Sequence, residues 1–181
     1  VTPNDADQAD LKPGKQVKVD DPAKLTDDEK GQVSAGITTA NPTAPIKSIK
    51  VNDDGSATVT FNDDSTKTVP SNVVKTDKSK YTVAAGQTVN LTHGKQVQKG
   101  DSLDSSAVTL TDAQGHPVSL PDGAKVVWTE APDTSEVGND KTGQAKVVYG
   151  DQTESEPVKV TYNVTPNDAD QADLKPGKQV K

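Results

Sequence analysis

The sequence contains no cysteine, no methionine and no arginine, and its 181 residues include one tryptophan, one phenylalanine and three tyrosines. No disulfide or thiolate metal site can therefore hold the fold, which must depend on packing and backbone hydrogen bonds. Every one of the 20 basic residues is a lysine, so the bidentate guanidinium contact with phosphate is absent. Because the formal net charge is also -7, we do not expect nucleic acid as a partner.

Hydrophobic residues are scarce as well, at 30% of the chain. Those present alternate in short runs, which indicates small folded units with thin cores rather than disorder. No apolar run approaches the roughly 20 residues that cross a bilayer, and no signal peptide or wall-anchoring tail is recognisable. We therefore expect no membrane contact, and a chain that comes from a longer protein.

Eighteen residues, VTPNDADQADLKPGKQVK, occur at 1–18 and again unchanged at 164–181. The two starts are 164 − 1 = 163 residues apart, well beyond the roughly 20–50 residues of a solenoid repeat. Each period must then contain whole domains, which indicates a tandem array. Residues 1–18 are polar and contain Pro13-Gly14, so they are predicted to be a linker. Residues 165–181, the start of the next repeat, are expected to fray.

The stretch 19–75 is predicted to be a small α+β domain. Thr26 and Glu29 form a capping-box pattern at the start of a helix from about Asp27 to Ala40, and Pro42 prevents its continuation. Apolar and polar residues then alternate between turn sequences, which predicts a short antiparallel sheet under the helix. Its strands centre on Ile49–Val51, Ala57–Phe61 and Thr66–Val69.

The stretch 80–164 shows strand patterns only, separated by turn clusters, and is predicted to be an immunoglobulin-like β-sandwich. Its strands centre on Val89–Leu91, Val108–Leu110, Val126–Trp128, Ala145–Tyr149 and Val158–Tyr162. The alternation of the last strand continues to Val164, so this strand should run into the repeated segment. The fold class is thus mainly β, with an α+β unit preceding the sandwich.

Several motifs of this second stretch resemble the Rib/alpha-like repeat of Gram-positive surface proteins. They are Leu120-Pro121-Asp122-Gly123, Trp128, Pro132-Asp133-Thr134, Gly138 and Ala145-Lys146-Val147-Val148-Tyr149. The earlier stretch LTDDEKGQVSAGITTANP, with IKSIKVNDDGSATVTFNDDSTKTV, is similar to the helix-and-hairpin unit of the long form of this repeat, common in lactobacilli. Two turns differ from the family. The usual Tyr-Pro-Asp-Gly turn is Tyr149-Gly150-Asp151-Gln152 here, and the usual Asp-Gly after Phe61 is Asp63-Asp64.

The resemblance implies an immunoglobulin-like sandwich in an extracellular, cell-wall-anchored protein, whose tandem copies hold a distal adhesin away from the envelope. The implied partners are neighbouring repeats of the same chain, with a host glycan or protein bound through other domains, and the chain is expected to be a monomer. The alternative is an adhesive module that itself binds mucin glycans or a host protein.

We expect no catalytic, cofactor-binding or metal-binding residues, and no enzyme. His93 and His116 could each serve as the base of a serine hydrolase triad, but both occur in turn sequences and no Gly-x-Ser-x-Gly motif is present. The carboxylate pairs Asp5/Asp7, Asp53/Asp54 and Asp63/Asp64 lack the spacing of a calcium loop and are typical of turns.

Trp128 could offer a stacking surface for a sugar, but its place in an alternating strand favours burial. A covalent Lys–Asn bond, which would need a buried carboxylate beside the pair, remains open at this point. The prediction is therefore a spacer made of two small domains, each about 30 Å across.

Overall fold

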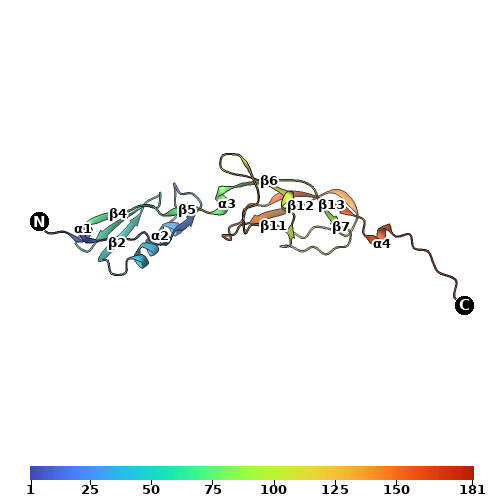
Figure 1. The fold of residues 1–181 in the computed structure, drawn as a ribbon, viewed down its shortest axis with the longest axis horizontal. Helices are drawn as coiled ribbons and strands as arrows, with labels where there is room; N and C mark the ends of the chain where they lie inside the picture. The colour runs from blue at the N-terminus through green and yellow to red at the C-terminus, as the bar shows by residue number, and fades with distance from the viewer. The chain divides into compact units, whose positions relative to one another are not determined.

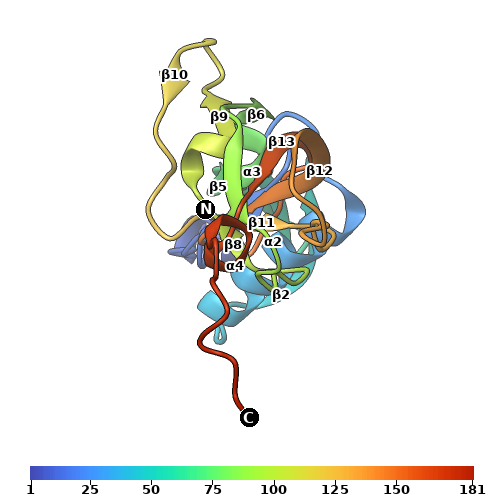
Figure 2. The same ribbon diagram turned by 90° about the vertical axis from the view of Figure 1, so that its right-hand side faces the viewer.

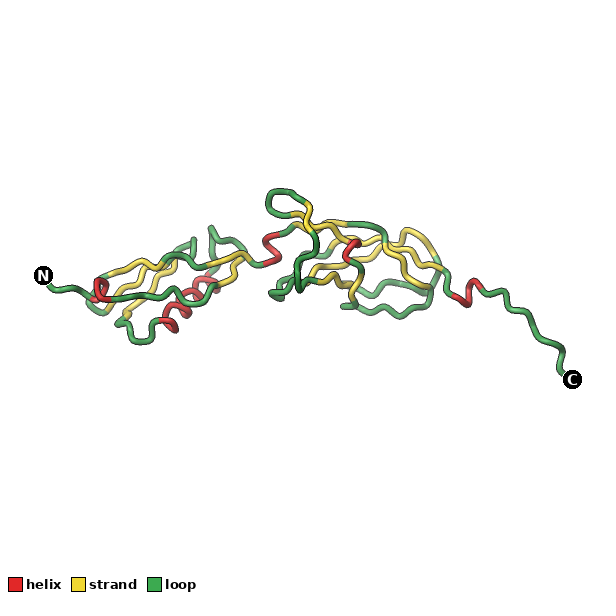
Figure 3. Tube along the Cα trace, viewed as in Figure 1, coloured by secondary structure: helices red, strands yellow, loops and turns green.

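A computed structural model describes all residues from 1 to 181. The chain forms two units, Val1–Ser79 (unit 1) and Lys80–Lys181 (unit 2), and each has its own core. Strands make up most of the regular structure in unit 2, whereas helices and strands contribute equally in unit 1. Figure 3 shows the strands in yellow. The predicted fold class, mainly β with an α+β unit before the sandwich, is confirmed. None of the helices is both long and apolar enough to span a bilayer.

Unit 1 is a three-stranded antiparallel sheet with one long helix packed on it (Figure 1). The sheet has the order β2-β3-β4, and a separate parallel pair joins β1 to β5. In chain order the elements are α1 (Asp5–Gln8), β1 (Val17–Val19), α2 (Asp27–Ala40), β2 (Ile46–Val51), β3 (Ala57–Phe61), β4 (Thr66–Val69), β5 (Val73–Lys75) and α3 (Asp77–Lys80).

The helix α2 has the bounds that the sequence predicts. Its N-terminus is held by the capping box, in which the Thr26 hydroxyl accepts from the Glu29 amide and the Glu29 carboxylate accepts from the Thr26 amide. The buried face carries Val33 and Ile37. At the other end the Asn41 amide group donates to the Ile37 carbonyl, which satisfies one of the free carbonyls of the last turn.

The core of unit 1 depends on alternation in the central strand β3. Ala57, Val59 and Phe61 point to one face and are completely buried, while the intervening threonines are partly exposed. Phe61, the single phenylalanine of the chain, is the largest of these side chains. Because the cluster contains few large residues, each one contributes a large share of the stability of the unit.

The predicted linker at residues 1–18 is wrong as a description of this segment. Leu11 and Val17 pack against the core of unit 1, and Val17 pairs with Val73 in the parallel β1–β5 ladder. The polar composition is misleading because two well-placed apolar residues and backbone hydrogen bonds are enough to attach the segment. The first unit accordingly begins before residue 19.

Unit 2 is built from two facing sheets with the largest core cluster of the chain between them. One sheet has the order β10-β9-β6, which Figure 2 shows together at one side of the unit, and the other has the order β7-β13-β12-β11-β8. The elements are β6 (Thr82–Ala85), β7 (Val89–Thr92), β8 (Ser102–Leu103), the 3-10 turn η1 (Ser105–Ala107), β9 (Val108–Thr111), β10 (Pro117–Val118), β11 (Lys125–Trp128), β12 (Gly138–Val148), β13 (Val158–Thr165) and α4 (Asp168–Gln171).

Trp128 lies at the centre of the unit 2 core. It is 1% exposed and meets Tyr162 edge to face, with ring centroids 5.7 Å apart at an interplanar angle of 83°. A Cβ atom at Gly143 would lie 3.0 Å from the Trp128 ring, so this glycine leaves room for the indole. Burial of Trp128 is thus confirmed, and its ring is not a sugar platform.

Turns in both units share one hydrogen-bonding pattern, which begins with an aspartate. An aspartate accepts from the amide, and in most cases also from the hydroxyl, of a serine or threonine two residues later, which fixes the turn without tertiary contacts. These turns begin at Asp54, Asp63, Asp104, Asp133 and Asp151. The hydrogen bonds from Ser56 lower the pKa of Asp54, and those from Ser65 lower the pKa of Asp63.

The two turns that differ from the resembled family keep the backbone that glycine would favour. Asp64 has φ 66° and Gln152 has φ 72°, both in the left-handed region that glycine adopts without strain. Each of these positions therefore carries a conformational cost of about 1–2 kcal/mol relative to an ordinary backbone conformation.

Candidate functional site

The repeated segment places identical residues in two different environments. In the first copy, residues 1–4 are exposed, with Val1 free of packing, and residues from Asp5 onward are attached to unit 1. The amides of Asp5 and Ala6 donate to the side chains of Asp63 and Ser65 at 2.8 and 3.0 Å.

Three further contacts hold the second half of this first copy. The Asn41 side chain forms two hydrogen bonds with the backbone of Lys12, accepting from its amide at 2.8 Å and donating to its carbonyl at 2.7 Å. The side chain of Asn72 donates to the Gly14 carbonyl. Gly14 has φ 78°, and a Cβ there would lie 2.6 Å from the carbonyl oxygen of Gly36 in α2, so only glycine fits this approach.

The second copy reverses the pattern. Val164, the counterpart of Val1, is 1% exposed and pairs with Leu91 as part of β13. Leu174 and Val180, the counterparts of Leu11 and Val17, are 87% and 93% exposed. Every residue beyond α4 is exposed, whereas α4 itself is a capped helical turn, and the fraying expected for 165–181 stays a prediction.

His93 attaches α4 to the body of unit 2. Its Nδ1 lies 2.5 Å from Asp170 Oδ2, its Nε2 lies 3.0 Å from the Ser135 carbonyl oxygen, and its own carbonyl accepts from the Asn167 side chain. The hydrogen bond to Asp170 raises the pKa of His93 against a smaller opposing effect of burial. The Asn167 amide, together with His93, lowers the pKa of Asp170.

These contacts do not form a hydrolytic triad. Both ring nitrogens of His93 are engaged, and the serine beside it offers a backbone carbonyl, because the Ser135 hydroxyl donates to Asp133. His116 is 77% exposed at its side chain and lies in a turn, 3.8 Å from Asp112. The structure therefore gives both histidines positions in turns and aligns no nucleophile with either.

The carboxylate pairs contact lysines and turn residues. Asp53 accepts from Lys30 at 2.8 Å, and this hydrogen bond lowers the pKa of the Asp53 carboxyl. Asp64 accepts from Lys47 at 2.6 Å. No group of three or more carboxylate or imidazole side chains gathers at a point where a metal ion could be held.

The geometry also bears on the open question of a covalent Lys–Asn bond. The buried polar residues are Asn41 and Thr76. Asn41 contacts backbone atoms only, and Thr76 contacts Asp20 and Ser79. Neither of these two buried residues has a lysine side chain among these hydrogen-bond partners.

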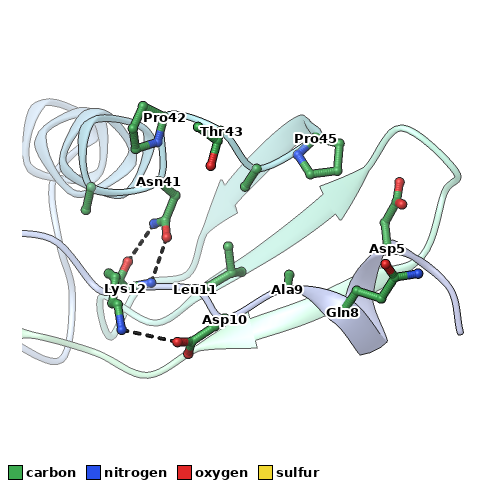
Figure 4. A pocket seen from close by; sticks show the side chains of 12 residues that line it. Asp5, Gln8, Ala9, Asp10, Leu11, Lys12, Asn41, Pro42, Thr43 and Pro45 are labelled. Carbon is green, nitrogen blue, oxygen red and sulfur yellow. Dashed lines mark hydrogen bonds and ion pairs between the residues drawn. The ribbon is translucent and has the colours of Figure 1, made fainter.

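A hollow of about 430 Å³ lies between the first copy of the repeated segment and the connection from α2 to β2 (Figure 4). Its polar walls include Asp5, Gln8 and Asp10 from the segment, and Thr43 from the connection. Asn41 spans the floor to Lys12, as the dashed lines in Figure 4 show. No aromatic ring lines it, so it lacks the stacking surface that sugar sites commonly use.

Residues 9–78 match the family model of the atypical Rib domain. This match lies in unit 1 and includes Leu11 and Val17 of the repeated segment. The expected resemblance to Rib repeats is thus confirmed, although the motifs that suggested a Rib sandwich, from Leu120 to Tyr149, lie in unit 2 outside the matched residues. The start of the match before residue 19 agrees with the packing of the segment onto unit 1.

Two solved structures of adhesins from Streptococcus sanguinis are similar to the chain. The SrpA adhesin shares 31% identity over 41% of each chain, with a TM-score of 0.38. A sialic acid-binding region of an adhesin, solved with 3'sLn, shares 16% identity over 88% of this chain and 47% of its own, with a TM-score of 0.44. The chain thus spans less than half of either structure. No curated protein sequence matches the chain.

Sequence reasoning identified the repeated segment but missed how it is held. The His93–Asp170 contact joins residues 77 positions apart, and the approach of Gly14 to Gly36 joins a turn to a helix face. The sequence contained a signal for the second contact. Gly36 lowers the helix propensity of α2, and nothing within the helix explains a glycine there, which points to a close approach by another segment.

Proposed function

We propose that this chain is a tandem-repeat spacer in the stalk of an extracellular, cell-wall-anchored bacterial adhesin, where it projects a distal binding domain. The observation that carries the proposal is the repeated segment, which completes the last strand of unit 2 at one end and attaches to unit 1 at the other. A segment with both capacities suits a chain in which unit 2 of one period is followed directly by unit 1 of the next.

The use of the aromatic residues supports a structural role. Trp128, Tyr149, Tyr162 and Phe61 are all buried, which commits nearly all of the few large side chains to the cores. Binding modules usually present aromatic or arginine side chains at their contact surfaces. The match to an atypical Rib domain agrees with a surface-protein module, and we propose no catalytic activity.

The experiment is small-angle X-ray scattering on chains of one, two and three periods. A spacer predicts that the maximum dimension increases linearly with copy number, by a constant increment per period. A particle whose dimension grows as the cube root of mass would contradict the proposal, because the units would then be collapsing on one another.

The second candidate is direct adhesion, and the hollow of Figure 4 is the specific observation that favours it. Its polar groups could bind a host glycan, the class of ligand named for one of the two adhesin structures. A glycan array discriminates the two functions. Specific binding that is lost in a Gln8→Ala variant, whose side chain lines the hollow, would favour the module over the spacer.

A further inference from the structure

We propose that residues 164–181 are a shared joint, which belongs at the same time to unit 2 of its own period and to unit 1 of the next. The partner that occupies the exposed part of this segment is thus a second copy of residues 19–79. The inference rests on the tandem arrangement proposed above, and it specifies which contacts make the connection.

The first step is that the two copies use largely different parts of the segment, which overlap only in the helical turn. Unit 2 holds the first part, through the strand position of Val164, the Thr165 hydroxyl on the Leu91 carbonyl, and the Asn167 side chain on His93. Unit 1 holds the later part in the other copy, from Asp5 onward. Neither unit alone uses the whole segment.

The second step is that the two sets of contacts use different atoms of the helical turn. In α4 the contact to unit 2 comes from the Asp170 side chain. In α1 the contacts to unit 1 come from the backbone amides of Asp5 and Ala6, whose counterparts are Asp168 and Ala169. No atom of the segment is required to bond to both units.

The third step is that the two helical turns have the same backbone. The N-caps Asn4 and Asn167 have φ −85° and −87°, and the C-caps Ala9 and Ala172 have ψ 131° and 129°. Both turns carry the same capping box. A segment held by unit 2 therefore already presents the amides of Asp168 and Ala169 in the conformation that unit 1 binds.

The fourth step concerns the apolar residues that the second copy leaves in solvent. Leu174 and Val180 have identical counterparts that pack on the unit 1 core, and Gly177 has open space where Gly14 meets Gly36. Gly177 also does not adopt the positive φ of Gly14. Docking would bury both side chains and move Gly177 into the left-handed region that glycine permits.

The test extends the full chain after Lys181 with a second copy of residues 19–79. Both chains carry ¹⁵N only after residue 79, so that the duplicated sequences can be told apart by NMR. The amides of Lys175 and Val180 should exchange with solvent at least about tenfold more slowly in the extended chain than in the 181-residue chain. Their counterparts, Lys12 and Val17, donate to Asn41 and Asn72.

Matched variants make the test specific. Gly177→Ala should abolish the added protection in the extended chain, because its Cβ would meet the second copy of Gly36, and should have no effect in the 181-residue chain. Leu174→Asp should do the same. Gln179→Asp is the control of equal charge, since its counterpart Gln16 is exposed on unit 1, and it should leave the protection unchanged.

The inference is overturned if Lys175 and Val180 exchange equally fast in both chains, whether or not the added copy folds, or if Gly177→Ala has no effect on their protection. Scattering from the same extended chain separates this result from the spacer function. Protected amides in a collapsed particle would contradict the spacer alone, whereas unprotected amides in an elongated particle would contradict the shared joint alone.

Discussion

Replacing Val164 with alanine measures how firmly the repeated segment belongs to unit 2. The side chain is 1% exposed in the core, and the change removes two methyl groups. At about 0.8 kcal/mol for each buried carbon, with a further term for the cavity left behind, unit 2 should lose about 2 kcal/mol of stability. For a urea dependence of about 2 kcal/mol per molar, the midpoint should fall by about 1 M.

The assay is equilibrium unfolding in urea, followed by tryptophan fluorescence. Trp128 is the single tryptophan and is buried in unit 2, so the signal reports this unit alone. The control is Val1→Ala, which makes the same change in the other copy of the segment, where the side chain is fully exposed. A loss below about 0.5 kcal/mol, the range of surface substitutions, would refute burial of Val164 in the core.

Three further predictions concern a helix cap, a turn residue with positive φ and an ion pair. Thr26→Ala should cost unit 1 about 1 kcal/mol, seen as an earlier urea transition by circular dichroism with no shift in tryptophan fluorescence. Gln152→Gly should stabilise unit 2 by about 1 kcal/mol in urea, and an unchanged or lower midpoint would contradict the strain at φ 72°. Because the pKa of His93 is raised, its ion pair with Asp170 is complete below the ordinary histidine pKa and is lost as pH rises through the raised value. As pH rises, hydrogen exchange of the α4 backbone amides with solvent should then accelerate by more than the intrinsic pH dependence of amide exchange. His93→Gln should remove this additional acceleration.

Local patterns were sufficient to predict much of the fold. The helix Asp27–Ala40 is specified by its capping box and by Pro42, and β3 by the alternation from Ala57 to Phe61. These signals act within a few residues, so they can be read from one sequence. The last strand also followed its alternation to Val164 as predicted.

Contacts between distant residues could not be read in the same way. Val17 pairs with Val73 in a parallel ladder, and parallel strands are not joined by a tight turn that could be recognised in the sequence. Leu11 is a single apolar residue in a polar stretch. Composition therefore predicted a linker where the structure has an attached segment. The His93–Asp170 contact was missed for the same reason, since neither residue has a local pattern that indicates the other.

The two environments of the repeated segment constrain different residues of it. Val164 is constrained only in the second copy, whereas the counterparts of Leu174, Gly177 and Val180 are constrained only in the first. In an array, each internal copy meets both sets of constraints at once, because the atoms that bond to the two units are different. A substitution that is silent at Val1 would then be costly in the next copy. We infer that a joint shared by two units constrains more of these eighteen residues than either unit alone would, because the two units fix different positions of the segment.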